Sequence, residues 1–326
     1  METNRVLNYR PSPVDTRDHT FKLIKNTVAL PSSIDLTSNC TTVKDQGSIG
    51  SCTAFATVAA MEYLEKKFNS NPNSNYSEMF TYYATRVNVE GWPASQDTGA
   101  YIRSAVKSTV TYGTCLETVW PYSNPFYRQP PTSVYNEAKK YKSISYVSTS
   151  PTNLSAIKTM LSVEVPVIIG FTCYSNLFDD SVSETGIILP SNGQIIGGHA
   201  VLAVGYDDAT GYIKFKNSWG TNWAIGGYGF MPYDYFTANV SEAWSILTEN
   251  NNGRLIATNN VTITNNALLN PQITAVLNDV VSNIDTAMNK SRYVSYFTSL
   301  AAQYPNNTKI INLINNLRNS FLTINQ

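Results

Sequence analysis

The sequence contains few cysteines and histidines, and it lacks any long apolar run. Four of its 326 residues are cysteine and two are histidine. This is too little cysteine for a disulfide scaffold and is typical of a reducing compartment. No stretch of about 18 apolar residues exists to span a bilayer, and the N-terminus lacks the basic-then-apolar pattern of a signal peptide. We therefore expect a soluble protein without a classical signal peptide or a membrane partner, in the cytoplasm or another reducing compartment.

An excess of charge of either sign is also missing. The 23 basic residues balance 23 acidic ones, so no net field favours polyanions and we expect no nucleic-acid partner. The sequence has no Gly-rich phosphate loop, and Cys52 and His199 have no neighbours at metal-ligand spacing. No metal or other cofactor is predicted.

The apolar pattern divides the chain into three parts. Residues 1–30 carry prolines and scattered charges without an apolar period, which predicts an extended arm. Residues 31–250 change from helical spacing to strand-like alternation. This predicts an α+β domain with a helical lobe at about 45–140 and a β lobe at about 141–250. Residues 251–326 are rich in asparagine but keep apolar residues at helical spacing, so we expect a helical extension.

The clearest helix runs from Cys52 to Lys67, where nearly every face is apolar. Such a helix is expected to be buried at the centre of the domain. A helix N-terminus presents unpaired N–H groups and the positive end of the dipole, so a thiol at Cys52 is expected to shift toward the reactive thiolate. Taken alone, however, most such cysteines are small buried apolar residues.

A hairpin is predicted to bring a histidine and an asparagine together. Residues 199–206 and 212–217 have strand character and are joined by a turn-like stretch rich in aspartate. With the turn centred near residue 208, opposed residue numbers sum to about 416 to 418, which sets His199 across from Asn217 or its near neighbours. The Asn217 amide oxygen can then accept a hydrogen bond from the imidazole and fix its tautomer. Each residue alone also fits a purely structural role.

Gln46 and Trp219 complete the candidate site. Gln46 precedes Cys52 by six residues, and its amide can join the Cys52 N–H in binding the oxyanion that forms during acyl transfer. Trp219 follows Asn217 by two residues and is large enough to shield the histidine–asparagine contact from water. A loop glutamine and a core tryptophan are the competing interpretations.

Three motifs in this order resemble the papain and cathepsin cysteine proteases. They are Gln46-Gly47-x-x-Gly50-Ser51-Cys52-x-Ala54-Phe55, Gly198-His199-Ala200, and Asn217-Ser218-Trp219-Gly220 with Gly226-Gly227-Tyr228-Gly229. His199 follows Cys52 by 147 residues, within the interval of about 130 to 150 that the family signature has. The resemblance covers roughly residues 31–250 and implies the two-lobed papain-like fold, with the active site in a cleft between the lobes.

The resemblance also implies a role for each site residue. Cys52 is the nucleophile, His199 the base and then the acid, Asn217 the residue that orients the imidazole, and Gln46 an oxyanion donor. Gly198 and Trp219 then flank the histidine within the substrate-binding region.

Substrate binding is implied at two further places. Gly99 and Ala100 fall where such enzymes bind the substrate backbone. A pocket beside His199, lined partly by Ala200, is expected to take an apolar side chain two residues before the cleaved bond. The partners are therefore polypeptides, and because no histidine-bearing insertion restricts access to chain ends, we expect an endopeptidase.

Some features depart from the family pattern and leave alternatives open. Ile49 and Thr53 stand where relatives usually have a cysteine and a tryptophan, so the disulfide beside the nucleophile is absent. The arm is shorter than the propeptide of most relatives, and we hypothesise that it lies across the cleft and inhibits the enzyme. A catalytically silent papain-fold binding protein with a blocked cleft is one alternative, and a transglutaminase-like acyl transferase is another.

Overall fold

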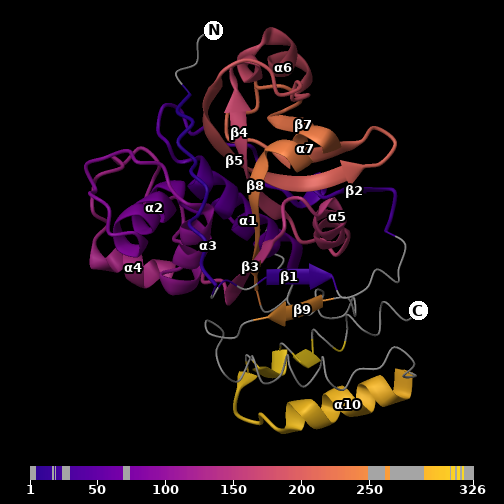
Figure 1. Cartoon of the computed structure of the whole chain (residues 1–326). Helices are drawn as coiled ribbons and strands as arrows, with labels where there is room; N and C mark the ends of the chain where they lie inside the picture. Colours follow the sequence, from indigo (N-terminus) through magenta and orange to yellow (C-terminus); the bar gives the residue numbers. More distant parts are fainter. Residues whose placement is uncertain are drawn as a thin grey trace.

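The computed structural model shows one group of helices on one side of the molecule and a large sheet, with further helices beside it, on the other (Figure 1). It describes residues 5–16, 18, 20–23, 30–68, 74–248, 261–264, 290–308, 310–312, 314, 315 and 318. The helical group precedes most of the sheet in the chain, so the α+β class and the order of the two lobes predicted from the apolar period are confirmed.

Within the described residues, nine strands form one sheet in the order β7-β6-β5-β4-β8-β3-β1-β9, and β2 pairs with β5. The β1–β3 pair is parallel, and the other strand pairs are antiparallel. In chain order the strands are β1 (Thr20–Leu23), β2 (Ser33–Asp35), β3 (Ser145–Thr149), β4 (Val167–Tyr174), β5 (Ile195–Asp207), β6 (Tyr212–Lys216), β7 (Tyr228–Pro232), β8 (Val240–Leu247) and β9 (Val261–Thr264).

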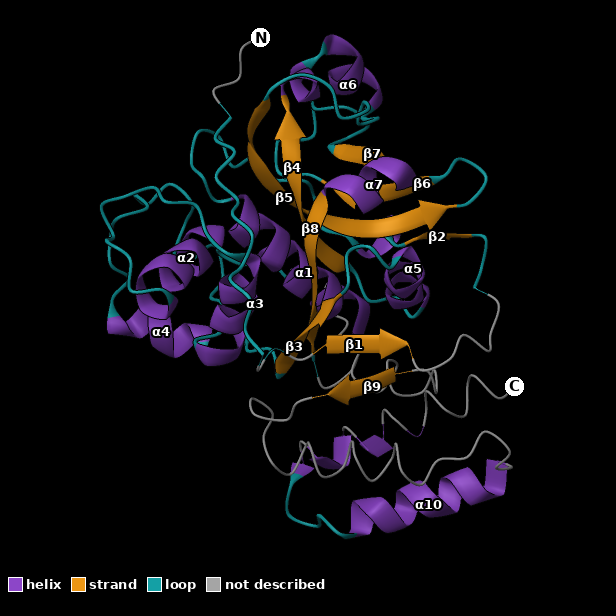
Figure 2. Ribbon diagram, viewed as in Figure 1, coloured by secondary structure: helices purple, strands orange, loops and turns teal. Residues whose placement is uncertain are grey.

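The helices divide between the two sides. Figure 2 shows α2, α3 and α4 gathered beside α1, whereas α5, α6 and α7 lie along the sheet. The helices are α1 (Cys52–Phe68), α2 (Glu78–Tyr83), α3 (Ile102–Thr111), α4 (Thr132–Ala138), α5 (Leu154–Ser162), α6 (Asp180–Thr185), α7 (Tyr233–Asn239) and α10 (Lys290–Ala302), with short helical turns η1 (Thr37–Asn39), η2 (Ala84–Val89) and η3 (Ser175–Phe178).

Helix α1 forms the centre of the domain, as its apolar composition predicts. It is buried along most of its length and contacts β5 and β4 of the sheet as well as α2 and α3. It begins at Cys52, and its last turn contains Lys66 and Lys67, whose positive charges interact favourably with the negative end of the helix dipole. The first residue of α1 therefore lies at the boundary between the helical lobe and the sheet.

Strand β4 lies inside the sheet between β5 and β8. Most of its residues are buried, as expected for a strand inside a sheet that is covered on both faces. Its pairing with β5 runs from Val167 opposite Ala203 to Cys173 opposite Gly197 and includes His199. The central strands thus hold the histidine in a rigid part of the fold.

Strands β1 and β9 connect parts that the sequence pattern had separated. β1, from the predicted arm, pairs with β3 and with β9, which belongs to the predicted C-terminal extension. Both parts therefore contribute to the sheet, which the pattern missed because a four-residue strand carries little periodic signal. Of the extension helices, the segment near residues 310–317 is helical at its described positions. The expected extension also has apolar residues at helical spacing in 273–284, and these lie outside the described residues. His19, which the sequence places in the arm and which is expected at its surface, lies outside them as well.

A bilayer-spanning helix would need a long apolar run, and none of the helices in the described residues has one.

Candidate active site

Cys52 lies at the head of α1 and is completely buried. Burial raises the pKa of Cys52 to about 11, and this outweighs the backbone N–H groups of Ala200, Thr53 and Tyr9, which face the sulfur and favour the thiolate. The predicted shift toward the thiolate is therefore wrong for this structure. The physical reason is that part of the N-terminal arm covers the sulfur and removes it from water.

His199 lies on β5, and its ring is held by Asn217. Nε2 of His199 lies 2.8 Å from Oδ1 of Asn217. Because the amide oxygen is an acceptor, Nε2 carries the proton and Nδ1 is left as the acceptor nitrogen. Nδ1 has no hydrogen-bond partner among the described residues. Burial lowers the pKa of His199 to about 4, although the Asn217 hydrogen bond acts to raise it, so the ring is neutral here.

The predicted hairpin is present, with a register slightly different from the expected one. Paired residue numbers sum to 419 next to the turn, as for Asp207 with Tyr212, and to 418 beyond a bulge, as for Leu202 with Lys216. The ladder ends at that last pair, so Asn217 lies beyond it and reaches His199 diagonally. Such diagonal neighbours are still within reach of long side chains.

Trp219 lies against the histidine ring. The two rings stack with centroids 4.8 Å apart and an interplanar angle of 25°. Phe178 also stacks on Trp219, at 5.8 Å, and Trp219 is buried. The tryptophan therefore covers one face of the histidine ring.

Gln46 is completely buried and its amide is oriented. Its Oε1 accepts a hydrogen bond from Ser218 Oγ at 2.6 Å. This directs Nε2 toward the carbonyl oxygen of Ile49 at 2.9 Å and that of Val6 in the arm at 3.5 Å. The amide N–H groups thus point toward an oxygen of the segment that fills the site.

A segment of the N-terminal arm lies between the lobes at this site, and it is the indigo trace in Figure 1. The N–H of Tyr9 donates to the Gly198 carbonyl at 3.0 Å, and the Gly198 N–H donates to the Leu7 carbonyl at 3.3 Å. On the helical side, a Cβ at Gly99 would lie only 1.9 Å from the carbonyl oxygen of Asn8. Gly99 and Gly198, two of the predicted substrate-binding residues, therefore both contact the backbone of the arm.

The two predicted substrate-binding alanines lie in different surroundings. Ala100 is completely buried and packs in a cluster with Ala54 and Tyr82, so its side chain is part of the core. Ala200 lies opposite Gly170 in the sheet, and Gly170 is in close contact with the Tyr9 ring. Ala200 therefore belongs to the surface that receives an arm side chain.

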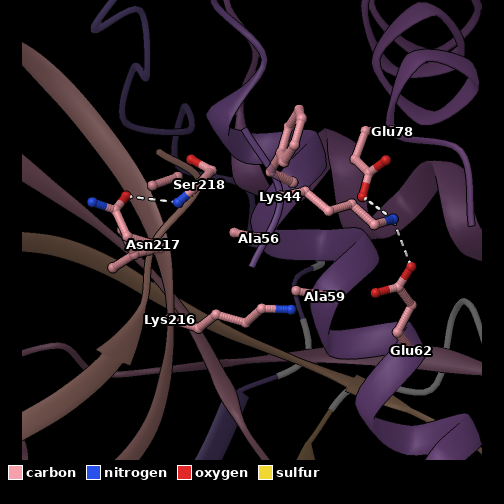
Figure 3. Close-up of a pocket in the computed structure, with 11 residues that line it drawn as sticks. Lys44, Ala56, Ala59, Glu62, Glu78, Lys216, Asn217 and Ser218 are labelled. Carbon is pink, nitrogen blue, oxygen red and sulfur yellow. Dashed lines mark hydrogen bonds and ion pairs between the residues drawn. The ribbon is translucent and has the colours of Figure 1, made fainter. Parts of the chain in front are cut away.

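A buried charge network lies beneath the site (Figure 3). Lys44 Nζ donates to Glu78 Oε1 at 2.6 Å, to Glu62 Oε1 at 2.8 Å and to the Tyr76 carbonyl at 3.1 Å. The two glutamate side chains are only 3% and 1% exposed. Burial raises the pKa of Glu78 to about 7, with the Lys44 ammonium acting in the opposite direction. One lysine thus holds two buried carboxyl groups on α1 and α2.

Lys216 extends this network to the β lobe. It directly precedes Asn217 and is only 5% exposed. Its Nζ donates to Thr41 Oγ1 at 2.9 Å, and Thr41 donates in turn to Glu62. Burial lowers the pKa of Lys216. Figure 3 shows its side chain pointing toward α1, beside an internal cavity of about 10 Å³.

Three residues of this region were not predicted from the sequence. Tyr9 is one of two aromatic residues of the arm, with Phe21, and this was an available signal. Lys216 alternates with Ile213 and Phe215 in a strand, a pattern that does not distinguish a buried lysine from an exposed one. Ser241, whose hydroxyl contacts Tyr9 of the arm, lies at a bulge where β8 pairs with β4, and no pattern in the sequence marks the position of this bulge.

The described ranges contain no cluster of three or more His, Cys, Asp or Glu side chains arranged to hold a metal ion. All four cysteines are buried and unpaired.

Comparisons with known proteins agree with this arrangement. The model of the papain family cysteine proteases matches residues 30–246. An uncharacterized peptidase C1-like protein of Acanthamoeba polyphaga mimivirus is 36% identical over 214 residues, which cover 62% of this chain and 68% of that protein.

Two solved structures share the fold. Xylellain, a cysteine protease from Xylella fastidiosa, superposes with a TM-score of 0.68 at 34% identity and covers 76% of this chain and 97% of its own. A Carica candamarcensis cysteine protease solved in complex with E-64 has a TM-score of 0.52 at 25% identity, over 67% of this chain and 99% of its own. Because the family model matches more than half of the sequence and these structures share its two lobes, the chain belongs to the papain family of cysteine proteases.

Proposed function

We propose that the chain is an endopeptidase that hydrolyses peptide bonds through a thioester intermediate. The Cys52 sulfur passes its proton to Nδ1 of His199 and attacks the substrate carbonyl carbon, forming a C–S bond. His199 then gives this proton to the departing amine as the C–N bond breaks. Water, deprotonated by the same imidazole, hydrolyses the thioester and restores the thiol.

One observation carries this proposal. The Cys52 sulfur faces the backbone N–H of Ala200, the residue that follows His199, while the far nitrogen of the imidazole is bonded to Asn217 at 2.8 Å. The nitrogen without a partner, Nδ1, is therefore the one available to exchange a proton with the sulfur. A structural histidine would instead be expected to have both nitrogens satisfied.

Gln46 and Asn217 have supporting roles in this mechanism. The Gln46 amide, fixed by Ser218, is proposed to donate to the oxyanion that forms on the substrate carbonyl. Asn217 holds the tautomer and the orientation of the imidazole. The pocket beside His199 is proposed to take an apolar side chain two residues before the cleaved bond, because Ala200 and Gly170 leave room there for a ring.

The arm is proposed to keep the enzyme latent. The Tyr9 backbone lies at the Cys52 sulfur and is held there by its N–H, which donates to the Gly198 carbonyl at 3.0 Å, so the arm occupies the place where a substrate would bind. With pKa values of about 11 for Cys52 and about 4 for His199, both groups are neutral near pH 7 in the covered site. Displacing the arm rehydrates them and allows the thiolate to form.

Contacts at both ends support this role for the arm. Arg5 pairs with Asp45 and donates to the Trp219 carbonyl at 3.3 Å. At the other end, Arg103 Nη1 donates to the Pro13 carbonyl at 2.9 Å and lies 3.4 Å from Asp18. The blocking residues are thus tied down on both sides of the cleft.

The same contacts favour a second candidate, a papain-fold binding protein whose cleft stays closed. Labelling by E-64, which binds the Carica relative, separates the two. We expect the inhibitor to label the full chain once Tyr9→Ala loosens the arm, and the label to be lost with Cys52→Ala. Cys115→Ala, at another buried cysteine, is the matched control and should keep the label. Absence of labelling in the loosened chain would support the closed binding protein.

A further inference from the structure

The carboxylate of Asp97 bonds to the loop that leads into helix α1. Its Oδ2 accepts a hydrogen bond from the Gly50 N–H at 2.9 Å, two residues before Cys52. Gly50 is buried, and a Cβ there would lie 3.1 Å from the other carboxylate oxygen of Asp97. A hydrogen bond from an N–H group to a carboxylate is about twice as strong as one between neutral groups. The carboxylate therefore fixes the Gly50 N–H just before the helix that carries the nucleophile.

The same peptide unit also holds the Gln46 side chain. The Gly50 N–H and the Ile49 carbonyl belong to one planar trans peptide, in which the two groups point in opposite directions. The Ile49 carbonyl accepts a hydrogen bond from Gln46 Nε2 at 2.9 Å and one from the Ser51 N–H at 2.8 Å. Asp97 and Gln46 therefore bond to opposite sides of a single peptide group.

This peptide decides where the second hydrogen of the Gln46 amide points. Ser218 Oγ donates to Oε1 of Gln46 at 2.6 Å, and the Ile49 carbonyl accepts one of the two Nε2 hydrogens. The other hydrogen is left to point into the cleft, where the Val6 carbonyl of the arm lies 3.5 Å from Nε2. A rotation of the Ile49–Gly50 peptide would take its carbonyl away from Nε2 and release the amide from this orientation.

The Asp97 carboxylate is itself held in place. The hydroxyl of Tyr82, a completely buried side chain on α2, donates to Oδ1 of Asp97 and accepts the Gly99 N–H at 3.1 Å. Arg86 Nη1 donates to the Gln96 carbonyl at 2.6 Å, which fixes the backbone just before Asp97. The two carboxylate oxygens thus have separate partners, and Oδ2 is left for the loop before α1.

We propose that Asp97 is a positioning residue for the peptidase reaction, because it orients the Ile49–Gly50 peptide and, through it, the Gln46 amide that donates to the oxyanion. The inference rests on the proposed function and adds to it a residue that acts through another side chain. All four cysteines are unpaired, so no disulfide holds this loop in place of the carboxylate. The arm bonds to Asp97 through a different atom, since Asn8 Nδ2 donates to its backbone carbonyl at 3.2 Å.

The test uses the full-length Tyr9→Ala chain and a fluorogenic dipeptide amide with an apolar first residue. Asp97→Ala should lower kcat by about 10- to 100-fold, because a misdirected oxyanion donor loses much of its effect, and should change KM by less than about threefold. Asp97→Asn keeps an acceptor for the Gly50 N–H and should retain kcat within about fivefold. Asp180→Ala, at an exposed position on α6, is the control and should change neither constant.

A double variant separates positioning from a general loss of structure. Gln46→Ala removes the amide through which Asp97 is proposed to act, so adding Asp97→Ala to it should lower kcat further by less than about threefold. Full multiplication of the two losses, or an unchanged kcat in Asp97→Ala, would overturn the inference while leaving the peptidase function intact.

A measurement on the unreacted chain tests the coupling without catalysis. In a full chain with isotope-labelled glycine and glutamine, Asp97→Asn weakens the bond to the Gly50 N–H. NMR should then show the signals of this N–H and of the Gln46 side-chain amide moving together, whereas Asp180→Asn should move neither. An unmoved Gln46 side-chain signal in Asp97→Asn would refute the proposal, whether or not the protein hydrolyses peptides.

Discussion

Nε2 of His199 and Oδ1 of Asn217 lie 2.8 Å apart although the hairpin ladder that joins their strands ends one residue before the asparagine. The contact is therefore held by the side chains, by Trp219 stacked on the imidazole, and by the Asn217 N–H, which donates to the Gly227 carbonyl at 3.0 Å. This arrangement makes the orientation of the ring sensitive to the amide itself.

Asn217→Ala is expected to lower kcat/KM of the Tyr9→Ala chain by about 10- to 100-fold, because a misoriented imidazole loses its near-attack geometry. The hydrogen bond to Asn217 raises the pKa of His199, so the histidine limb of the pH–rate profile should also move to lower pH. Steady-state kinetics across pH measures both effects. Asn136→Ala, at an exposed position on α4, should change neither, and an unaltered pH profile in Asn217→Ala would refute the orienting role.

Tyr9→Ala is expected to raise the rate of E-64 labelling of the full chain by at least about tenfold, because deleting a buried ring costs several kcal/mol of packing. Val14→Ala provides the control on the same arm, since Val14 is 98% exposed and should leave the rate unchanged. Mass spectrometry of the labelled protein measures the rate. Equal labelling rates in Tyr9→Ala and in the unaltered chain would show that the arm does not control access.

Lys44→Met and Lys216→Met are expected to differ in their cost to stability. Removing Lys44 leaves two buried carboxyl groups without their cation, which typically costs about 3–5 kcal/mol. Removing Lys216 loses one hydrogen bond to the neutral Thr41, and we expect a loss of about 1 kcal/mol. Urea unfolding at pH 7 in the Cys52→Ala background, which prevents self-digestion, gives both values. Lys214→Met is the control, because the ion pair of Lys214 with Asp35 is solvent-exposed. Equal losses of stability for Lys44→Met and Lys216→Met would contradict the role of Lys44 as the cation that holds the two buried carboxyl groups.

The stability of the protein should depend on His199 between pH 6.5 and pH 4. Burial lowers the pKa of His199 from 6.5 to about 4. The unfolded chain therefore takes up a proton in this window before the folded chain does, and stability is lost as pH falls. This difference in pKa between the unfolded and folded chain corresponds to about 3 kcal/mol of folding stability. The test compares the Cys52→Ala chain with the Cys52→Ala/His199→Gln chain. Between pH 6.5 and pH 4, the free energy of unfolding of Cys52→Ala should fall further than that of the double variant, by up to this amount. Parallel pH curves for the two chains would mean that His199 is not buried in solution.

The site was more predictable than its surroundings, and the reasons are physical. The position of Cys52 follows from an apolar helix preceded by Gly and Ser, and the hairpin brings Asn217 within diagonal reach of His199. Both are local patterns. The docking of Tyr9 is set by backbone pairing with a strand about 190 residues away in sequence, which no local period encodes. Ser241 lies at a bulge, and Lys216 is buried against Thr41 and near the carboxyl groups of Glu62 and Glu78, which come from other segments of the chain.

The N-terminal segment has two roles that meet near Val14. The residues before it fill the cleft, whereas β1, which follows it, lies between β3 and β9 in the sheet. A proteolytic cut at the exposed Val14 would free the blocking peptide and leave β1 paired, so β3 would gain no open edge for another chain to join. Maturation by this route would unmask the catalytic groups without creating a site for aggregation.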